Sequence, residues 1–539
     1  MSDVRVPQRV SIYDTTLRDG SQLEGISLTV DDKLRIAEQL DWLGVGYIEA
    51  GYPGANPKDD ELFARAPAEL ALTTSRLVAF GSTRRPRGKV DSDDSLRHLI
   101  EAGTSTACIV GKCWDYQVTE ALQTTLDEGV AMVADSVAFL KGQGLEVLFD
   151  AEHFFDGYKR NPEFSLRVLE AAAQAGADWL VLCDTNGGSL PFDVETAVRA
   201  VVSYVDTPVG VHLHNDAECG TANALAGVRG GATQVQGTIN GYGERTGNCN
   251  LVSIIPNLSL KMGVETIPSD RMERLTPVAH HVAELVNMPL NPQAPYVGES
   301  AFAHKAGLHT SAIARRPDAY EHVPPESVGN GTRFVVSELA GRSTIGLKAK
   351  ELGIELDGPT LGAVVDKLKE LEHAGYHFEV ADASLELLMR HAAGWRPEWF
   401  EVESFRVITD DLAAGDTPGG VTTEATIKLF VGGERLIATA EGNGPVNALD
   451  GALRQAVGSR FPALAHVHLT DFKVRVLDTA KGTAAVTRVL VDSTDGERTW
   501  TTIGVSENII EASWQALFDS LVYGLLRAEQ REQESAHAD

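Results

Sequence analysis

The sequence has few of the features that would tie a protein to a membrane or to an oxidising compartment. No apolar run approaches the roughly 20 residues that span a bilayer, and the first residues lack the charged and apolar regions of a secretory signal. The 539 residues include only five cysteines and no C-x-x-C pair, which fits a reducing compartment. We therefore expect a cytoplasmic protein with buried or incidental thiols at Cys108, Cys113, Cys183, Cys219 and Cys249.

Basic residues are also scarce. The chain has 47 lysines and arginines against 76 aspartates and glutamates, so its formal net charge is -29. No Lys/Arg-rich run offsets this charge locally, and a nucleic acid is therefore not an expected partner. The chain is too long for one hydrophobic core, and its length predicts two to four domains.

Short β-rich runs alternate with helix-like segments over residues 1–266. The segment 31–40 illustrates a connecting helix, with acidic residues at its start and Leu34, Ala37 and Leu40 at helical spacing. Eight such units within about 250 residues predict an α/β fold, a closed (β/α)8 TIM barrel. The expected strands are 10–13, 47–49, 77–80, 106–110, 146–149, 179–183, 209–214 and 234–239.

Polar residues gather where these strands end. Active sites of such barrels lie at the carboxyl ends of the strands, so these residues are functional candidates. They combine an arginine, several carboxylates and two imidazoles: Arg18, Asp19, Glu49, Asp150, Glu152, Asp184, Thr185, His212 and His214, with the loop 241–248 after the last strand.

His212 and His214 are two residues apart on an expected strand, so both imidazoles point to one face and can bind one ion. Such a pair also occurs by chance, but its place at a catalytic barrel end favours a metal site. Nitrogen and oxygen ligands without a thiolate suit Zn²⁺, Mn²⁺ or Mg²⁺, and the sequence does not choose among them. If Asp19 and Asn248 complete a set of four, other positions stay open for substrate oxygens.

Three segments together carry a family resemblance: DTTLRDG (residues 14–20), HLHND (212–216) and NGYGERTGN (240–248). They resemble the signatures of the DRE-TIM metallolyase superfamily, and within it the acetyl-CoA-dependent 2-isopropylmalate, homocitrate and citramalate synthases. The resemblance runs over nearly the whole chain. It implies an acyltransferase that converts the acetyl group to an alkyl group on transfer, with thioester hydrolysis making the reaction effectively one-way.

The resemblance also implies roles for individual residues. Arg18 and Glu152 would supply the Arg and Glu of the superfamily's name, with Arg18 as electrostatic stabiliser of a developing alkoxide because a guanidinium does not deprotonate. Thr185 would bind the carboxylate of a 2-oxo acid, and Asp14 would be a supporting residue. The implied metal ligands are Asp19, His212, His214 and Asn248.

A base must take a proton from the methyl group of acetyl-CoA. His309 resembles the family histidine that assists this step, with Tyr320 as its companion, and His304 is a rival for the same role. In the relatives these residues come from the partner subunit. The resemblance therefore implies a homodimer whose active site is completed by the second chain.

Beyond the barrel the pattern changes twice. Residues 267–399 predict helical linker subdomains with Pro-rich interruptions. Residues 400–527 alternate as strands do, in two similar stretches that each close with a helix, which predicts an α+β regulatory domain of duplicated βββα units. We expect helices at 361–371, 445–457 and 507–526, strands at 423–430 and 473–477, and a disordered polar tail at 528–539.

The segment AEGNGPVNAL (440–449) resembles the glycine-proline turn at which an end-product amino acid binds in 2-isopropylmalate and citramalate synthases. It implies a regulatory role for Gly442, Gly444 and Pro445, with isoleucine as the expected effector. Without the resemblance, these residues are equally well explained as a loop that enters a helix with proline near its start.

The choice of 2-oxo acid rests on finer detail. Segments 320–330 and 336–343 resemble the citramalate synthase branch, which implies pyruvate as substrate and (R)-citramalate as product, on a route to isoleucine. The alternative is 2-oxoisovalerate, giving 2-isopropylmalate for leucine, because one methylene is worth only about 1–3 kcal/mol. Homocitrate synthesis ranks third, since beyond Arg18 only the loop residues Arg84 and Arg85 offer a cation. Asp150 lies where related enzymes vary with substrate, so the sequence does not assign the residues of the substrate pocket.

Two further functional classes are alternatives to a synthase. An aldolase-type lyase of the same superfamily would have no need of the C-terminal module. A non-catalytic effector-binding protein would be expected to have lost Arg18 or a metal ligand, and the sequence keeps them all.

Overall fold

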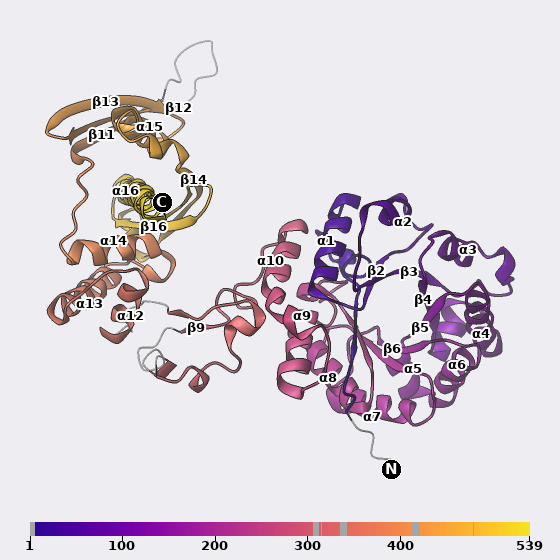
Figure 1. Cartoon of the computed structure of the whole chain (residues 1–539). Coiled ribbons are helices and arrows are strands. Elements are labelled where there is room, and N and C mark those ends of the chain that lie inside the picture. The colour runs from indigo at the N-terminus through magenta and orange to yellow at the C-terminus, as the bar shows by residue number, and fades with distance from the viewer. Residues whose placement is uncertain are drawn as a thin grey trace, which may run out of the picture. The chain divides into compact units, whose positions relative to one another are not determined.

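The computed structural model describes residues 6–304, 312–313, 315–334, 342–411, 421–477 and 479–538. The chain forms two compact units (Figure 1). The first comprises Met1–Phe302 and Glu321–Thr332, and the second comprises Ala303–Tyr320 and Arg333–Asp539. Among the described helices, none is long and apolar enough to cross a membrane.

The first unit contains a closed barrel of parallel strands in sequence order. The barrel closes where β1 pairs with β8, with Ser11 opposite Gln234 and Asp14 opposite Gly237. Each predicted strand has a counterpart in the described chain, which confirms the TIM barrel. The strands are β1 (Ser11–Asp14), β2 (Tyr47–Gly51), β3 (Arg76–Ser82), β4 (Thr106–Lys112), β5 (Glu146–Glu152), β6 (Trp179–Asp184), β7 (Val209–Leu213) and β8 (Gln234–Gly237).

Helices cover the outside of the barrel (Figure 1). The first of them begins at a capping box, in which the Thr29 side chain accepts from the Asp32 backbone and the Asp32 side chain accepts from the Thr29 backbone. It ends at Gly44, whose φ of 98° suits glycine. The helices are α1 (Val30–Leu43), α2 (Pro57–Glu69), α3 (Asp94–Glu101), α4 (Leu126–Gly142), α5 (Phe154–Arg160), α6 (Pro162–Gln174), α7 (Pro191–Val202), α8 (Gly220–Gly230), α9 (Leu251–Pro256) and α10 (Leu275–Leu285).

The limit expected at residue 266 falls inside the first unit. Leu275, Val278 and Val282 of α10 belong to the same buried core as the barrel, so this helix packs with the barrel and not with a separate linker. The domain limits drawn from the sequence therefore remain predictions, and the described chain groups residues 267–302 with the barrel.

The second unit repeats one pattern, three antiparallel strands followed by a helix (Figure 1). This arrangement confirms the predicted βββα duplication. The first repeat is β11 (Glu401–Asp411), β12 (Val421–Val431), β13 (Glu434–Gly442) and α15 (Pro445–Val457), and the second is β14 (His468–Val476), β15 (Thr487–Thr494), β16 (Thr499–Ser506) and α16 (Ile509–Ala538).

The remaining elements of the second unit are mostly helical. α13 covers the predicted helix 361–371 and extends it at both ends. Hydrophobic side chains of these helices share a small core with Ile503 of β16. The elements are β9 (Ala303–His304), which pairs with β10 (Arg333–Phe334), and the helices α12 (Arg342–Glu351), α13 (Gly358–His373) and α14 (Asp382–Ala392).

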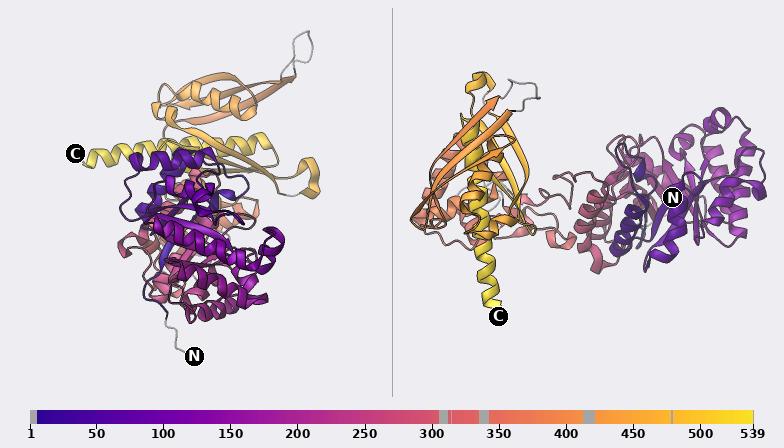
Figure 2. Two further views of the ribbon diagram at one scale, coloured as in Figure 1. Left: turned by 90° about the vertical axis from the view of Figure 1, so that its right-hand side faces the viewer. Right: turned by 90° about the horizontal axis from the view of Figure 1, so that it is seen from above.

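The prediction of a disordered tail at 528–539 was wrong, because α16 continues to Ala538. Figure 2 shows this helix as one long rod that extends past the strands it packs against. The tail is rich in Glu, Gln, Arg and Ala, which are strong helix formers. Arg531 also forms ion pairs with Asp495 and Glu497, each at 3.2 Å, and these tie the extension to the turn after β15.

Candidate active site

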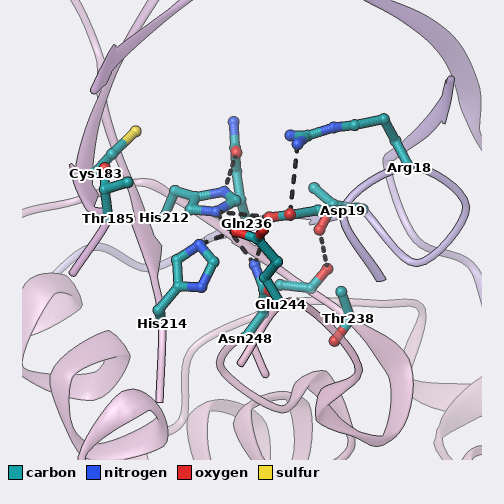
Figure 3. A network of polar contacts seen from close by, with 12 residues as sticks. Arg18, Asp19, Cys183, Thr185, His212, His214, Gln236, Thr238, Glu244 and Asn248 are labelled. Atoms are coloured by element: carbon teal, nitrogen blue, oxygen red, sulfur yellow. Dashed lines mark hydrogen bonds and ion pairs between the residues drawn. The ribbon is translucent and has the colours of Figure 1, made fainter. Parts of the chain in front are cut away.

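The ends of β1 and β7 and the loop after β8 bring together the four residues expected to bind a metal (Figure 3). Asp19 is at the centre: its Oδ2 lies 3.1 Å from His212 Nε2 and 3.8 Å from His214 Nε2. The Asn248 amide donates to the same oxygen at 2.8 Å. All four residues are buried. The structure therefore places two imidazoles, a carboxylate and an amide around one point.

These four side chains fit a divalent cation. The ligating atoms of Asp19, His212 and His214 lie within 4.8 Å of one another. Asn248 Oδ1 is buried without a hydrogen-bond partner in the described chain, and such an orphaned acceptor needs an explanation such as an ion. A Cβ at Gly243 would lie 1.9 Å from Asn248 Oδ1, so the backbone of Gly243 makes room for this oxygen.

The charges of the site are strongly coupled. Burial alone would raise the pKa of Asp19, but Arg18 and His212 outweigh it and hold the pKa well below its usual range. Burial opposes protonation of His212, yet the bond to Asp19 leaves its pKa raised. Burial and the neighbouring His212 lower the pKa of His214 to about 4. Asp19 thus stays ionised and His214 stays neutral at neutral pH, the forms that bind metal.

Arg18 is held on three sides. Its Nε donates to Glu49 Oε1 at 2.6 Å, and its Nη1 lies 3.5 Å from Asp19 Oδ1. The guanidinium carbon is 3.8 Å from the centre of the Phe80 ring, a cation–π contact. Burial opposes the charge, but the Glu49 and Asp19 carboxylates leave the pKa of Arg18 raised. A permanent positive charge therefore stands beside the metal set.

Glu152 lies at the end of β5 and has a different partner from Arg18. The structure pairs Glu152 with Lys112, and the carboxylate that supports Arg18 is Glu49. Glu49 also accepts a hydrogen bond from Tyr13 at 2.6 Å. The sequence signal for Glu49 was its position at the end of the second strand, one of several carboxylates at strand ends, and only the closed barrel distinguishes it from the others.

Thr185 follows the end of β6. Its Oγ1 accepts a hydrogen bond from the backbone N–H of His153 at 2.9 Å. The hydroxyl proton is then free to donate to a substrate oxygen. Its carbonyl accepts from Arg245 at 2.8 Å, and Arg245 in turn forms two hydrogen bonds with Asp216. Two strand ends thus fix the threonine expected to bind a carboxylate.

Asp14 is buried directly before the site loop. Its carboxylate accepts hydrogen bonds from the backbone and hydroxyl of Thr16, both at 2.9 Å. Thr16 Oγ1 accepts in turn from the backbone of Ile239. These contacts tie the loop that carries Asp19 to the loop after β8, which is the geometry of a supporting residue.

Two residues behind His212 were not expected to act together. The Nδ1–H of His212 donates to Gln236 Oε1 at 2.8 Å, and Gln236 Nε2 donates to Asp150 Oδ1 at 3.1 Å. Burial raises the pKa of Asp150 to about 6. A Cys108 thiol and the Glu49 carboxylate lie close to Asp150. Of the five thiols, which are all free, Cys219 alone is partly exposed.

Of the residues expected from the second chain, the two that the structure describes lie outside the first unit. His309 falls outside the described residues. Tyr320 and His304 belong to the second unit, where Tyr320 is 45% exposed and His304 lies in β9. The first unit therefore holds the metal set, Arg18 and Thr185, whereas Tyr320 belongs to the second unit.

The glycine-proline turn leads into α15, with Pro445 at the first helical position. A Cβ at Gly442 would lie 2.6 Å from Ala448 N and from Asn447 Oδ1, so this glycine is required for the close approach of strand and helix. Gly444 has open space around its Cβ position. Close packing therefore explains why position 442 is a glycine, but it does not explain the glycine at position 444.

Family models match three parts of the chain. Residues 9–277 match the HMGL-like family, residues 296–375 the homocitrate synthase post-HMGL domain-like family, and residues 379–525 the LeuA allosteric (dimerisation) domain. These limits follow the barrel, the helical region and the duplicated sheets.

Several relatives are similar over almost their whole length. An (R)-citramalate synthase of Aquifex aeolicus is 52% identical over 97% of this chain and 99% of its own. One of Streptomyces coelicolor is 52% identical over 96% of this chain and 97% of its own. A probable 2-isopropylmalate synthase of Methanopyrus kandleri is 33% identical over 95% of this chain and 97% of its own.

Proposed function

The chain belongs to the (R)-citramalate synthase family and is an enzyme that transfers the acetyl group of acetyl-CoA, and from this premise we propose that its acceptor is pyruvate. The proposed reaction forms a carbon–carbon bond between the acetyl methyl carbon and the keto carbon of pyruvate. Water then cleaves the thioester, and the products are (R)-citramalate and CoA. The observation that supports this function most is the complete metal set beside the fixed guanidinium of Arg18.

A divalent cation held by Asp19, His212, His214 and Asn248 would polarise the keto group of the 2-oxo acid. The protein's own contribution is to hold these donors in place, with Asp19 ionised and His214 neutral. Asn248 and Gly243 together leave an amide oxygen free for this purpose. Zn²⁺, Mn²⁺ and Mg²⁺ all fit the donor types.

Arg18 would stabilise the negative charge that develops on the keto oxygen as the new bond forms. Its guanidinium is already oriented by Glu49 and Phe80, so little reorganisation is needed in the transition state. Thr185 would donate its hydroxyl proton to the carboxylate of pyruvate. Arg18 thus contacts the keto oxygen of pyruvate, on which charge develops, and Thr185 contacts its carboxylate.

Removal of a proton from the acetyl methyl group needs a base within hydrogen-bond reach. We assign this step to His309 with Tyr320, both supplied by the partner subunit. Glu152, a carboxylate at the carboxyl end of the barrel strands, remains a proposed catalytic residue. The LeuA dimerisation match supports a homodimer. Exposed apolar side chains on β14, namely Leu469, Val474 and Val476, are consistent with such an interface.

Pyruvate is favoured over larger 2-oxo acids. Four relatives of 50–52% identity are (R)-citramalate synthases, whereas a probable 2-isopropylmalate synthase is 33% identical. For 2-oxoglutarate a second cation would be needed, and Arg84 is already bonded to Asp135 at 2.7 Å and to Glu128 at 2.7 Å. Synthesis of 2-isopropylmalate from 2-oxoisovalerate is the alternative.

The C-terminal unit gives the proposal its biological context. Residues 379–525 match an allosteric domain, and (R)-citramalate formation would serve isoleucine synthesis. We assign isoleucine as the inhibitor, with Gly444 and Pro445 near its site. Undiminished activity at millimolar isoleucine would contradict this assignment.

The test is release of free thiol from acetyl-CoA by metal-replete protein. Pyruvate, 2-oxoisovalerate, 2-oxobutyrate and 2-oxoglutarate are supplied separately, and the products are identified by mass. We expect the highest kcat/KM with pyruvate. With chelator-treated protein we expect no release of thiol. A preference for 2-oxoisovalerate would move the activity to 2-isopropylmalate synthesis, and no release with any acid would overturn the synthase proposal.

A further inference from the structure

A buried chain of hydrogen bonds runs from the metal set into the barrel. His212 Nδ1 is 2.8 Å from Gln236 Oε1, and Gln236 Nε2 is 3.1 Å from Asp150 Oδ1. His212 is 5%, Gln236 0% and Asp150 3% exposed, so water does not compete for these contacts. Figure 3 shows the amide oxygen of Gln236 facing the ring of His212.

The chemistry of the three groups gives the chain a direction. An ionised carboxylate only accepts hydrogen bonds, so Asp150 has to face the NH₂ group of Gln236. The amide oxygen of Gln236 is then turned toward His212 and accepts from Nδ1–H. Neutral imidazole carries one proton, and with that proton on Nδ1 the lone pair lies on Nε2. Nε2 is the atom that faces Asp19 at 3.1 Å.

We infer that Asp150 and Gln236 are positioning residues that select the tautomer of His212 and so set the strength of the metal site. This role rests on the metal site proposed above. Partners of this kind orient ligating histidines, and their loss typically costs roughly 10- to 100-fold in metal affinity. His214 lacks such a partner on its Nδ1 in the described chain, so the support is confined to one of the two histidines.

The test exploits the direction of the chain. Asp150→Asn lets the introduced amide present either oxygen or nitrogen to Gln236, so the tautomer is no longer selected. Gln236→Glu sets two carboxylates about 3.1 Å apart, and they repel each other. The double variant Asp150→Asn/Gln236→Glu restores the direction, because the introduced amide donates to the introduced carboxylate, which accepts from His212.

Mn²⁺ affinity of the apo full-length protein, followed by electron paramagnetic resonance of the free ion, is the readout. We expect each single variant to bind Mn²⁺ roughly 10- to 100-fold more weakly and the double variant to recover to within about threefold of the parent. Side-chain volumes hardly change across this series, so a packing role would not give this pattern. Single variants that bind like the parent, or a double variant that binds no better than the singles, would overturn the inference.

Gln234→Leu is the matched control for loss of a buried glutamine on the same strand. Gln234 lies two residues before Gln236, is fully buried, and its side-chain amide has no partner in the described chain. Its replacement should leave Mn²⁺ affinity unchanged, whereas Gln236→Leu should weaken it as the other single variants do. Equal weakening of Mn²⁺ binding by both leucine variants would overturn the inference that Gln236 positions His212. A parent protein that binds no Mn²⁺, Zn²⁺ or Mg²⁺ would instead overturn the metal site itself.

Discussion

Two aspartates in different units of this protein meet burial in opposite ways. Asp19 of the barrel lies beside Arg18 and His212, and these two groups hold its pKa well below the usual range despite burial. Asp519 of α16 accepts a hydrogen bond from the Ser384 hydroxyl at 2.9 Å, and burial raises its pKa to about 7. The positive groups beside Asp19 keep its carboxylate ionised, whereas no cation among the described residues offsets the burial of Asp519. We expect catalysis to depend on the groups around Asp19, and we expect the free energy of unfolding to depend on Asp519.

Arg18→Lys should have the largest effect on the charged site. Lysine keeps the charge but loses the planar contacts with Glu49, Asp19 and Phe80, so the cation is no longer fixed where negative charge develops. We expect kcat/KM to fall by about 10²- to 10³-fold in the thiol-release assay. Arg84→Lys is the control, because Arg84 is also buried and bonded to two carboxylates but supports α4, and it should keep parental kinetics. A variant at position 18 with more than about a tenth of parental kcat/KM would contradict the role.

Glu49→Gln tests whether the charge behind Arg18 matters. The glutamine preserves shape but removes the carboxylate that accepts from both Tyr13 and Arg18, so we expect about a 10- to 100-fold loss in kcat/KM. Glu146 at the other end of the barrel has the same kinds of partner, Tyr47 and Arg76. Glu146→Gln should leave kinetics unchanged, and equal losses in both variants would show that the effect is on folding.

Gly442→Ala and Gly444→Ala separate packing from ligand binding in the C-terminal unit. A Cβ at position 442 meets backbone at 2.6 Å, so this variant should lose about 1–3 kcal/mol of unfolding free energy in denaturant titrations. Gly444 has open space and an extended φ of -179°, so its variant should be as stable as the parent. A change in isoleucine inhibition in Gly444→Ala alone would then report on the effector site, and an unchanged stability of Gly442→Ala would contradict the packing argument.

Asp519→Asn should have the smallest effect, and its sign is set by pH. Burial raises the pKa of Asp519 in the folded state to about 7 from an ordinary value of 3.8, so the folded state holds the proton more tightly. Protonated Asp519 therefore contributes to the free energy of unfolding in full below pH 4, and this contribution is lost as pH rises toward 7. Because the residue is partly exposed, we expect the variant to be more stable than the parent by only about 1–2 kcal/mol at pH 8 and equal to it at pH 4. Calorimetry at both values measures the difference, and the opposite sign would contradict the comparison.

The fold was largely predictable because its signals are local. Strand runs separated by helical patterns predicted the barrel, and α15 begins and ends at the predicted residues 445 and 457. The tail was mistaken because its polarity resembled disorder, while its helix propensity and the ion pairs of Arg531 extend α16. Polarity alone does not separate a solvated helix from a coil.

For the site, the sequence by itself determined which chemical groups are available: the H-x-H pair, the arginine next to an aspartate, and the carboxylates at strand ends. Alternation along a strand was enough to place both imidazoles on one face. The tertiary structure alone decided that Glu49 is the strand-end carboxylate that contacts Arg18, and which side chains lie behind His212. Those contacts join β1 to β2 and β5 to β8 to β7, and they depend on how the barrel closes. Pairing across a closed barrel is set by register and stagger between strands, which no local pattern encodes.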